Sequence, residues 1–256
     1  MAIVLAFANQ KGGTGKTTTA VNVAAYAANA NKSVLLVDLD PQGNATSGLG
    51  VGKHALKASV YDVLTNSTPA MKAVCRTRVQ GLDLLPSNMS LVGAELELVN
   101  EMARENRLKD GLAAARSTYD YIFVDCPPSL GLLTVNAFAA ADGIIVPMQC
   151  EYYALEGLSQ LINSINLVKR HINPSLNIFG VVLTMYDPRL NLTQQVETEV
   201  KSYFGDKVFS AVIPRNIRLS EAPSHGLPIC LYDGRSKGAE SYMALTREII
   251  RRGDGR

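Results

Sequence analysis

A glycine-rich segment near the start of the chain joins an apolar run to a helical pattern, and few folds accommodate such a connection. The apolar run 2–8 predicts a buried strand, and residues 16–30 predict a helix. Glycines let the backbone curl so that successive N–H groups point at one spot, and the helix adds its positive N-terminal end. Together these features bind phosphate. The segment reads Asn9-Gln10-Lys11-Gly12-Gly13-Thr14-Gly15-Lys16-Thr17-Thr18.

Two side chains of this segment have the chemistry of a nucleotide site. Lys16 is placed to reach the β- and γ-phosphates, and the Thr17 hydroxyl is placed to coordinate Mg²⁺. A guanine-specific site would need an Asn-Lys-x-Asp element, and the candidate at residues 31–34 lacks the aspartate. The sequence therefore predicts a site for ATP or ADP with Mg²⁺. We expect the nucleotide to contact Lys11, Gly12, Gly13, Thr14, Gly15, Lys16, Thr17 and Thr18.

Apolar runs alternate with helical patterns along the whole chain. Several runs are continuously apolar, as in strands buried on both faces of a parallel sheet. The pattern predicts an α/β fold with a doubly wound, mostly parallel sheet flanked by helices on both faces, and one P-loop NTPase domain over residues 1–256. The predicted strands are 2–8, 33–37, 82–85, 121–124, 143–146, 178–183 and 208–213. The predicted helices are 16–30, 91–99, 104–115, 132–140, 154–171, 192–204 and 238–251.

The stretch 39–59 is rich in Gly and Asn and predicts a long functional loop. Acidic residues stand at two strand ends, where parallel sheets bind their ligands. Asp38 and Asp40 end the second predicted strand, and Asp125 follows the four apolar residues 121–124. The latter pattern is typical of a Walker B carboxylate, which predicts that Asp125 holds Mg²⁺ directly or through water.

The amino-acid composition indicates the cellular environment of the protein but says little about its binding partners. The chain is 47% hydrophobic and 19% charged, with four cysteines that form no C-x-x-C pair, as in a reduced cytoplasmic protein. The apolar stretches are shorter than the roughly 20 residues of a membrane span, so we expect no membrane association. A formal net charge of +2 gives no basis for predicting nucleic-acid binding.

The glycine-rich segment departs from the strict pattern G-x-x-x-x-G-K-[S/T], because Gln10 stands where the first glycine would be. It carries an additional lysine, Lys11, five residues before Lys16. This deviant motif resembles the ParA/MinD class of ATPases. The resemblance implies an ATP-dependent homodimer in which Lys11 reaches the partner subunit's nucleotide. Lys11, Lys16 and Asp40 would then be catalytic.

The resemblance also assigns the remaining nucleotide contacts. It implies that Asp40 positions the attacking water and that Asp38 is a structural or Mg²⁺-side carboxylate. Pro214 and Asn216 follow a late predicted strand, where related folds place the adenine, and are expected to contact the base.

Longer segments are similar to chromosomal ParA (Soj) proteins in particular: residues 38–48, 125–131, 151–158 and 212–224. This similarity spans nearly the whole chain. It implies a partitioning ATPase that binds double-stranded DNA non-specifically as an ATP dimer on the nucleoid. A centromere-binding ParB-type protein would stimulate the otherwise slow hydrolysis to ADP and phosphate and so release the DNA.

Because the phosphate-binding segment begins within about ten residues of Met1, we expect DNA to contact the surface of the ATPase domain itself. Arg189 and Arg218 match positions that the family uses for DNA. Lys201, Arg235 and Lys237 are further DNA-binding candidates by their nearness in the sequence.

Three alternatives share this fold. A MinD-like positioning ATPase would need a C-terminal amphipathic helix for a membrane, and residues 238–251 carry few bulky apolar side chains. An iron–sulfur protein of the nitrogenase type would need a second matched cysteine beside Cys126. An amide-forming ligase would need a small-molecule acceptor pocket, for which the sequence gives no sign.

Overall fold

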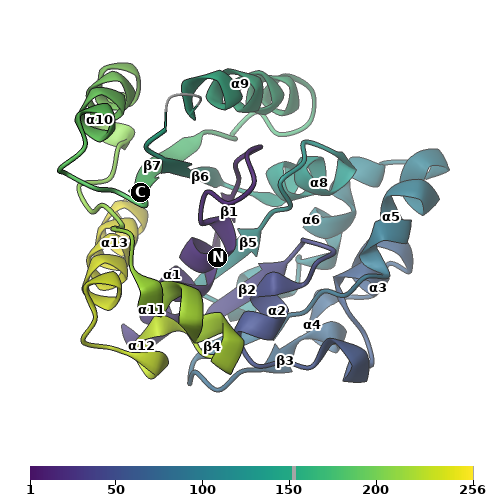
Figure 1. Ribbon diagram of the computed structural model, residues 1–256. Helices are drawn as coiled ribbons and strands as arrows, with labels where there is room; N and C mark the ends of the chain where they lie inside the picture. The colour runs from purple at the N-terminus through teal and green to yellow at the C-terminus, as the bar shows by residue number, and fades with distance from the viewer. Residues whose placement is uncertain (152–153, 256) are drawn as a thin grey trace.

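The computed structural model describes residues 1–151 and 154–255 and contains one seven-stranded sheet, ordered β3-β4-β2-β5-β1-β6-β7 (Figure 1). Neighbouring strands are parallel throughout, except that β3 is antiparallel to β4. This order places β1 inside the sheet, between the central strand β5 and β6. The strands are β1 (Ile3–Phe7), β2 (Val34–Asp38), β3 (Cys75–Arg76), β4 (Leu82–Leu85), β5 (Tyr121–Asp125), β6 (Gly143–Gln149) and β7 (Ile178–Thr184).

Helices connect these strands. The α-helices are α1 (Lys16–Asn29), α2 (Asn44–Gly48), α3 (Val60–Thr65), α4 (Ala70–Ala73), α5 (Leu91–Glu97), α6 (Arg107–Gly111), α7 (Ala115–Thr118), α8 (Leu132–Ala140), α9 (Ala154–His171), α10 (Asn191–Phe204), α11 (Ile217–Glu221), α12 (Ile229–Tyr232) and α13 (Lys237–Asp254). The 3₁₀ turns are η1 (Lys53–Ala55), η2 (Leu98–Asn100), η3 (Arg104–Asn106), η4 (Gly205–Lys207) and η5 (Ala222–His225). Among the described residues, no helix is both long and apolar enough to cross a bilayer.

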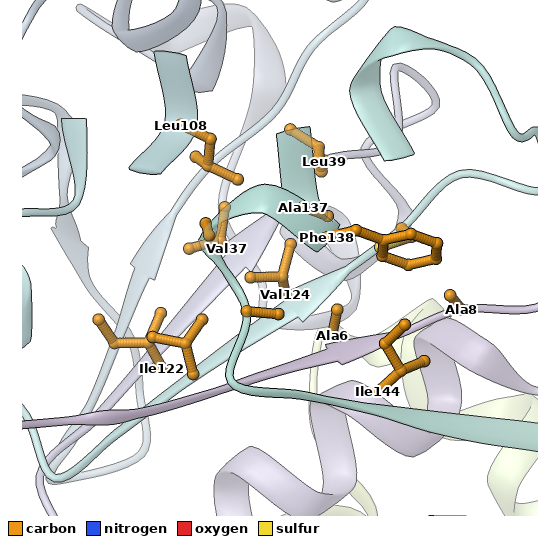
Figure 2. Close-up of a cluster of buried hydrophobic side chains, with 14 of the residues drawn as sticks. Ala6, Ala8, Val37, Leu39, Leu108, Ile122, Val124, Ala137, Phe138 and Ile144 are labelled. Atoms are coloured by element: carbon orange, nitrogen blue, oxygen red, sulfur yellow. The ribbon is translucent and has the colours of Figure 1, made fainter. Parts of the chain in front are cut away.

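Both faces of the sheet are covered, which confirms the predicted doubly wound fold. Side chains alternate along each strand, so Val4 and Ala6 face one layer while Leu5 and Phe7 face the other. Helices α3, α5, α6, α8 and α9 pack on the first face, where Val37, Val124, Phe138 and Ile144 meet (Figure 2). Helices α1, α12 and α13 pack on the second (Figure 1). Two hydrophobic cores, one on each face, thus fix the positions of the strands and of the residues at their carboxyl ends.

The predicted strand at residues 208–213 is wrong. The segment meets β7 at one isolated bridge, Val181 to Val208, and a second bridge joins Tyr186 to Pro214, just beyond both segments. The Phe209 and Ile213 N–H groups donate to the Val181 and Leu183 carbonyls, at 2.9 and 2.8 Å. Between the bridges, the carboxylate of Glu248 accepts the N–H groups of Ser210 and Ala211, at 2.9 and 3.3 Å. These N–H groups are satisfied by a side chain of α13, so no continuous ladder forms.

Two other predictions fail in detail. The predicted loop 39–59 contains α2 and η1, and the predicted helix 104–115 is broken into η3, α6 and the start of α7. The break has a local cause, because the Asn136 amide is inserted between the Arg104 carbonyl, at 2.9 Å, and the Leu108 N–H, at 3.1 Å. Those two groups would otherwise bond to each other in a helix. Part of the segment 151–158, namely 152–153, lies outside the described residues.

Candidate nucleotide-binding site

The predicted phosphate loop connects β1 to α1 at the centre of the sheet. Gly13 and Gly15 have φ angles of +74° and +82°, in the left-handed region that favours glycine. Gly15 is also the N-cap of α1, and no side chain caps this end of the helix. A Cβ atom added at Gly12 or Gly13 would meet no described atom within 4 Å. The loop therefore faces open space with free N–H groups at a helix N-terminus, the arrangement that binds phosphate.

Lys16 folds back over this loop. Its Nζ donates a hydrogen bond to the Lys11 carbonyl at 3.0 Å, and the side chain is largely buried. Burial lowers the pKa of Lys16, while Asp125, Cys126 and Asp40 act in the opposite direction. The ammonium is thus held between the loop and the carboxylates, as the predicted phosphate contact requires.

The register of the sheet places the acidic residues next to each other at the carboxyl ends of neighbouring strands. Asp125 at the end of β5 pairs with Phe7 on one side and with Asp38 on the other. The two carboxylates that the sequence separates by 87 positions therefore end adjacent strands, beside the strand that leads into the phosphate loop. Strand adjacency, which the sequence does not specify, creates this cluster.

Asp125 is fully buried, and neither carboxylate oxygen has a well-formed hydrogen bond among the described residues. Burial raises its pKa well above the ordinary value and Asp38 raises it further, whereas Thr17 and Lys16 lower it. A buried carboxylate without partners is costly unless a cation neutralises it. Mg²⁺ is commonly held by one or two carboxylates together with substrate phosphates, so Asp125 and Thr17 fit this ion.

Asp38 differs from Asp125 because its hydrogen bonds are satisfied. Its Oδ2 accepts the N–H and the hydroxyl of Thr46, both at 2.7 Å, and its Oδ1 accepts the Asp40 N–H at 3.2 Å. Burial raises the pKa of Asp38 to about 6 despite these bonds. Of the two roles predicted for Asp38, this geometry supports the structural one, since the carboxylate anchors the start of the segment that carries Asp40.

Asp40 lies in the turn after β2 and is mostly buried. One carboxylate oxygen accepts the Gln42 N–H at 2.9 Å, and its carbonyl accepts the Gly43 N–H at 2.8 Å. Gly43 itself has a φ of +61°. These bonds fix the backbone on both sides of the carboxylate that the sequence predicts to be catalytic.

The additional lysine, Lys11, is bound within its own chain. Its ammonium is paired with the carboxylate of Glu151, which lies just beyond β6. Both side chains are about two-fifths exposed, and the Lys11 N–H donates to Asn9 Oδ1 at 3.0 Å. Sequence reasoning did not identify Glu151 as a partner, because 140 positions separate the two residues.

Pro214 and Asn216 line a cavity of about 470 Å³ that opens beside the phosphate loop. Gly15 and Thr18 line its other side, so the structure brings the predicted base contacts and the loop together. The sequence missed Thr184 and Met185 in this wall. The Thr184 hydroxyl donates to the Thr14 carbonyl at 2.8 Å, and Met185 has a φ of +51°, which is unfavourable for a residue with a side chain.

The predicted DNA-binding residues lie on the surface, and three of them are ion-paired. Arg189 makes a bidentate contact with Asp187, at 2.9 and 2.7 Å. The exposed Arg215, which the sequence analysis did not select, also lowers the pKa of Asp187 and therefore lies near this pair. The other candidates are Arg218, paired with Glu221 at 2.9 Å, Lys201, paired with Glu197 at 2.6 Å, and the exposed Arg235 and Lys237.

The fold and this site define a P-loop NTPase with an additional lysine in its phosphate loop. A family model described as an AAA domain matches residues 2–178. The sporulation initiation inhibitor protein Soj of Bacillus subtilis is 56% identical, over 99% of this chain and 100% of that protein. The chromosome partitioning protein ParA of Myxococcus xanthus is 53% identical, over 97% of this chain and 88% of that protein. The chain belongs to the ParA/Soj family of chromosome-partitioning ATPases.

A protein named for a different activity has a solved structure with a similar fold. Cobyrinic acid a,c-diamide synthase from Mycobacterium smegmatis, with bound ADP and magnesium, has a TM-score of 0.88 and 38% identity. The match covers 100% of this chain and 97% of that one. Its identity is lower than that of the partitioning relatives, and its name corresponds to the amide-forming alternative considered from the sequence.

Proposed function

We propose that this protein is a Mg²⁺-dependent ATPase that switches between a DNA-bound ATP dimer and a released ADP state. The observation that carries the proposal is the meeting of Lys16, the open phosphate loop and the buried carboxylate of Asp125, which has no well-formed hydrogen bond among the described residues, at the carboxyl ends of the strands. The relative crystallised with ADP and magnesium supports this ligand set. ATP hydrolysis yields ADP and phosphate, so loss of the γ-phosphate removes the ligand that the switch senses.

Each residue of the site has a role in this reaction. Lys16 and the loop N–H groups bind the phosphates, and Asp40 orients the water that attacks the γ-phosphorus. Thr17 and Asp125 would hold Mg²⁺, which would neutralise charge on the phosphates. Lys11 adds a second positive charge at the phosphates of the partner subunit's nucleotide, so the full site requires a homodimer. Slow hydrolysis follows, because a single subunit lacks one cation of the catalytic set.

The DNA-binding surface includes Arg189 and Arg218, together with the exposed Arg215, which lies near the pair formed by Arg189 and Asp187. Lys201, Arg235 and Lys237 are weaker candidates. Contacts to phosphate give affinity without sequence preference, which suits a protein that coats the nucleoid. A ParB-type centromere-binding protein would then stimulate hydrolysis and release the dimer from DNA.

The test is binding of a random-sequence DNA duplex with Mg-ATP and with Mg-ADP, at about 50 and about 200 mM salt. We expect tight binding with ATP alone. If a dimer neutralises about six phosphates, the log–log salt slope is about −5 and affinity falls about a thousandfold over this range. Asp40→Ala should retain the ATP-bound, DNA-bound dimer, whereas Lys16→Gln should bind no nucleotide. Equal binding in both nucleotide states would reject the switch.

A further inference from the structure

Helix α5 and turn η2 are apolar on two opposite sides. Leu91, Ala94 and Leu98 are buried against the core. Val92, Leu96 and Val99 follow the same 3–4 spacing on the outer side and are exposed, Leu96 to 77%. A surface helix normally has one apolar stripe, and the second stripe here has no covering element among the described residues.

Two exposed methionines flank this outer side in the sequence, one before the helix and one after the turn. Met89 precedes α5 and is 59% exposed, and Met102 follows η2 and is 90% exposed. Single exposed apolar residues are ordinary, but a contiguous apolar surface marks a site of interaction. Methionine is adaptable in shape and is common at surfaces that bind partner helices. We name this surface the α5 stripe: Met89, Val92, Leu96, Val99 and Met102.

The charges beside the α5 stripe are acidic. Residues 89–107 contain Glu95, Glu97, Glu101 and Glu105 against Arg104 and Arg107, a net acidic balance, and Arg107 is paired with Glu101 at 2.6 Å. The Arg104 guanidinium is occupied by the Val99 carbonyl and by Glu105. A second copy meeting this face symmetrically would oppose like charges, which is unfavourable. The complementary partner therefore presents apolar side chains flanked by Lys or Arg.

The α5 stripe is connected to the nucleotide site through Glu95. Its Oε1 accepts the Leu133 N–H at the start of α8, at 3.4 Å, and stands where a Cβ on Gly131 would lie. Gly131 and Leu133 end the segment that begins at Asp125, the carboxylate assigned to Mg²⁺. Figure 1 shows α5 beside α3 and α8, on the opposite side of the molecule from α10 and α11. Helix α5 thus contacts the catalytic segment through Glu95, and the α5 stripe on the same helix lies apart from the proposed DNA surface.

We propose that the α5 stripe is the docking surface for a basic amphipathic segment of the protein partner that stimulates hydrolysis. This inference rests on the proposed function, which supplies the need for such a partner. Docking at α5 acts on Asp125 through Glu95 and Gly131. It leaves the DNA-binding arginines accessible, so one dimer holds DNA and the partner together.

The test uses the full-length protein with its cognate ParB-type partner and DNA. Two variants probe the surface: Leu96→Ser with Met102→Ser, and Glu97→Lys with Glu101→Lys. Leu167→Ser is the matched control, because Leu167 on α9 is also exposed, to 58%. We expect both double variants to lose at least about tenfold in partner-stimulated ATPase activity, as for central interface residues, and the control to keep it. Basal hydrolysis, ATP-dependent dimerisation and DNA binding should stay within about twofold.

Three outcomes separate the alternatives. Full stimulation of both double variants would overturn the docking surface and leave the proposed function standing. Loss of the ATP-dependent dimer would assign the α5 stripe to a second copy of the chain. Absence of stimulation in the unmodified protein would overturn the proposed function and, with it, the partner inferred here.

Discussion

The ammonium of Lys11 is paired with the carboxylate of Glu151, within one subunit. Lys11 is also the residue whose proposed role is to reach the partner subunit's nucleotide. The side chain must turn away from Glu151 to reach the other subunit, so we expect the pair with Glu151 to compete with dimer formation. The first prediction follows from this competition.

Replacing Glu151 with Gln should favour the ATP-bound dimer. Exposed ion pairs of this kind contribute about 0.2–1 kcal/mol, so the dimer dissociation constant should fall about 1.5- to 5-fold per released lysine. Sedimentation with ATP, in an Asp40→Ala background that suppresses hydrolysis, measures this constant. Asp254→Asn is the control, because it disrupts the remote ion pair with Lys32. A weaker dimer in Glu151→Gln would instead make Glu151 part of the dimer contact.

Asp125 and Asp38 predict a pH dependence of stability. A carboxyl group whose pKa is raised on folding binds its proton more tightly in the folded state. The free energy of unfolding therefore falls as pH rises from about 4, the unfolded value, through the folded value. That folded value is about 6 for Asp38. Because the pKa of Asp125 shifts in the same direction, metal-free protein should lose thermal stability as the pH rises from about 4 to about 6.

The Asp125→Asn substitution should stabilise the metal-free protein and weaken its response to Mg²⁺. Removing this buried, unpaired charge should raise the free energy of unfolding at pH 8, without metal, by about 1–3 kcal/mol. It should also flatten the pH dependence and remove the extra stabilisation that Mg²⁺ gives over nucleotide alone. Thermal unfolding with EDTA, and then with Mg-ATP, measures both effects. Exposed Asp206→Asn is the control, and a lower metal-free stability in Asp125→Asn would contradict the prediction.

Gly15→Ala should weaken the phosphate loop through backbone strain alone. Gly15 has a φ of +82°, and an added Cβ would lie 3.7 Å from Thr184, an ordinary contact. The left-handed conformation costs a residue with a side chain about 1–2 kcal/mol, which should appear as lost stability and as reduced nucleotide affinity. Gly52→Ala is the matched control, since Gly52 has a φ of −76° and open space around it. Denaturant unfolding and nucleotide titration should show a loss for Gly15→Ala and little change for Gly52→Ala. This difference distinguishes backbone strain at a positive φ from the general effect of replacing a glycine.

Arg218→Glu should abolish DNA binding and leave the ATP dimer intact. Arg218 is now paired with Glu221 at 2.9 Å and with Asp233 at 3.5 Å, and must exchange these partners for phosphate. Glu221→Gln should therefore increase DNA affinity. Arg218→Ala should reduce the magnitude of the salt slope by about two, one contact from each subunit of the dimer. Fluorescence anisotropy across a salt series measures the slope, and an unchanged slope would exclude Arg218 from the contact.

The sequence by itself determined the phosphate loop, the alternation of strands and helices, and the family. These features are local: an apolar run, glycines and a helix start all lie within residues 2–16, and burial on both faces of a parallel sheet leaves continuous apolar runs. The predicted bounds of the helix at residues 154–171 match α9 for the same reason, since its periodicity is strong.

Only the tertiary structure decided which distant groups meet. Strand order places Asp125 beside Asp38, the fold pairs Lys11 with Glu151, and Glu248 takes the N–H groups of Ser210 and Ala211 within the predicted strand 208–213. The Asn136 side chain likewise breaks a helix whose own sequence favours continuity. These contacts span from about 30 to 140 positions. Local pattern cannot encode them, because each depends on how separate elements pack and on which buried polar groups remain unsatisfied.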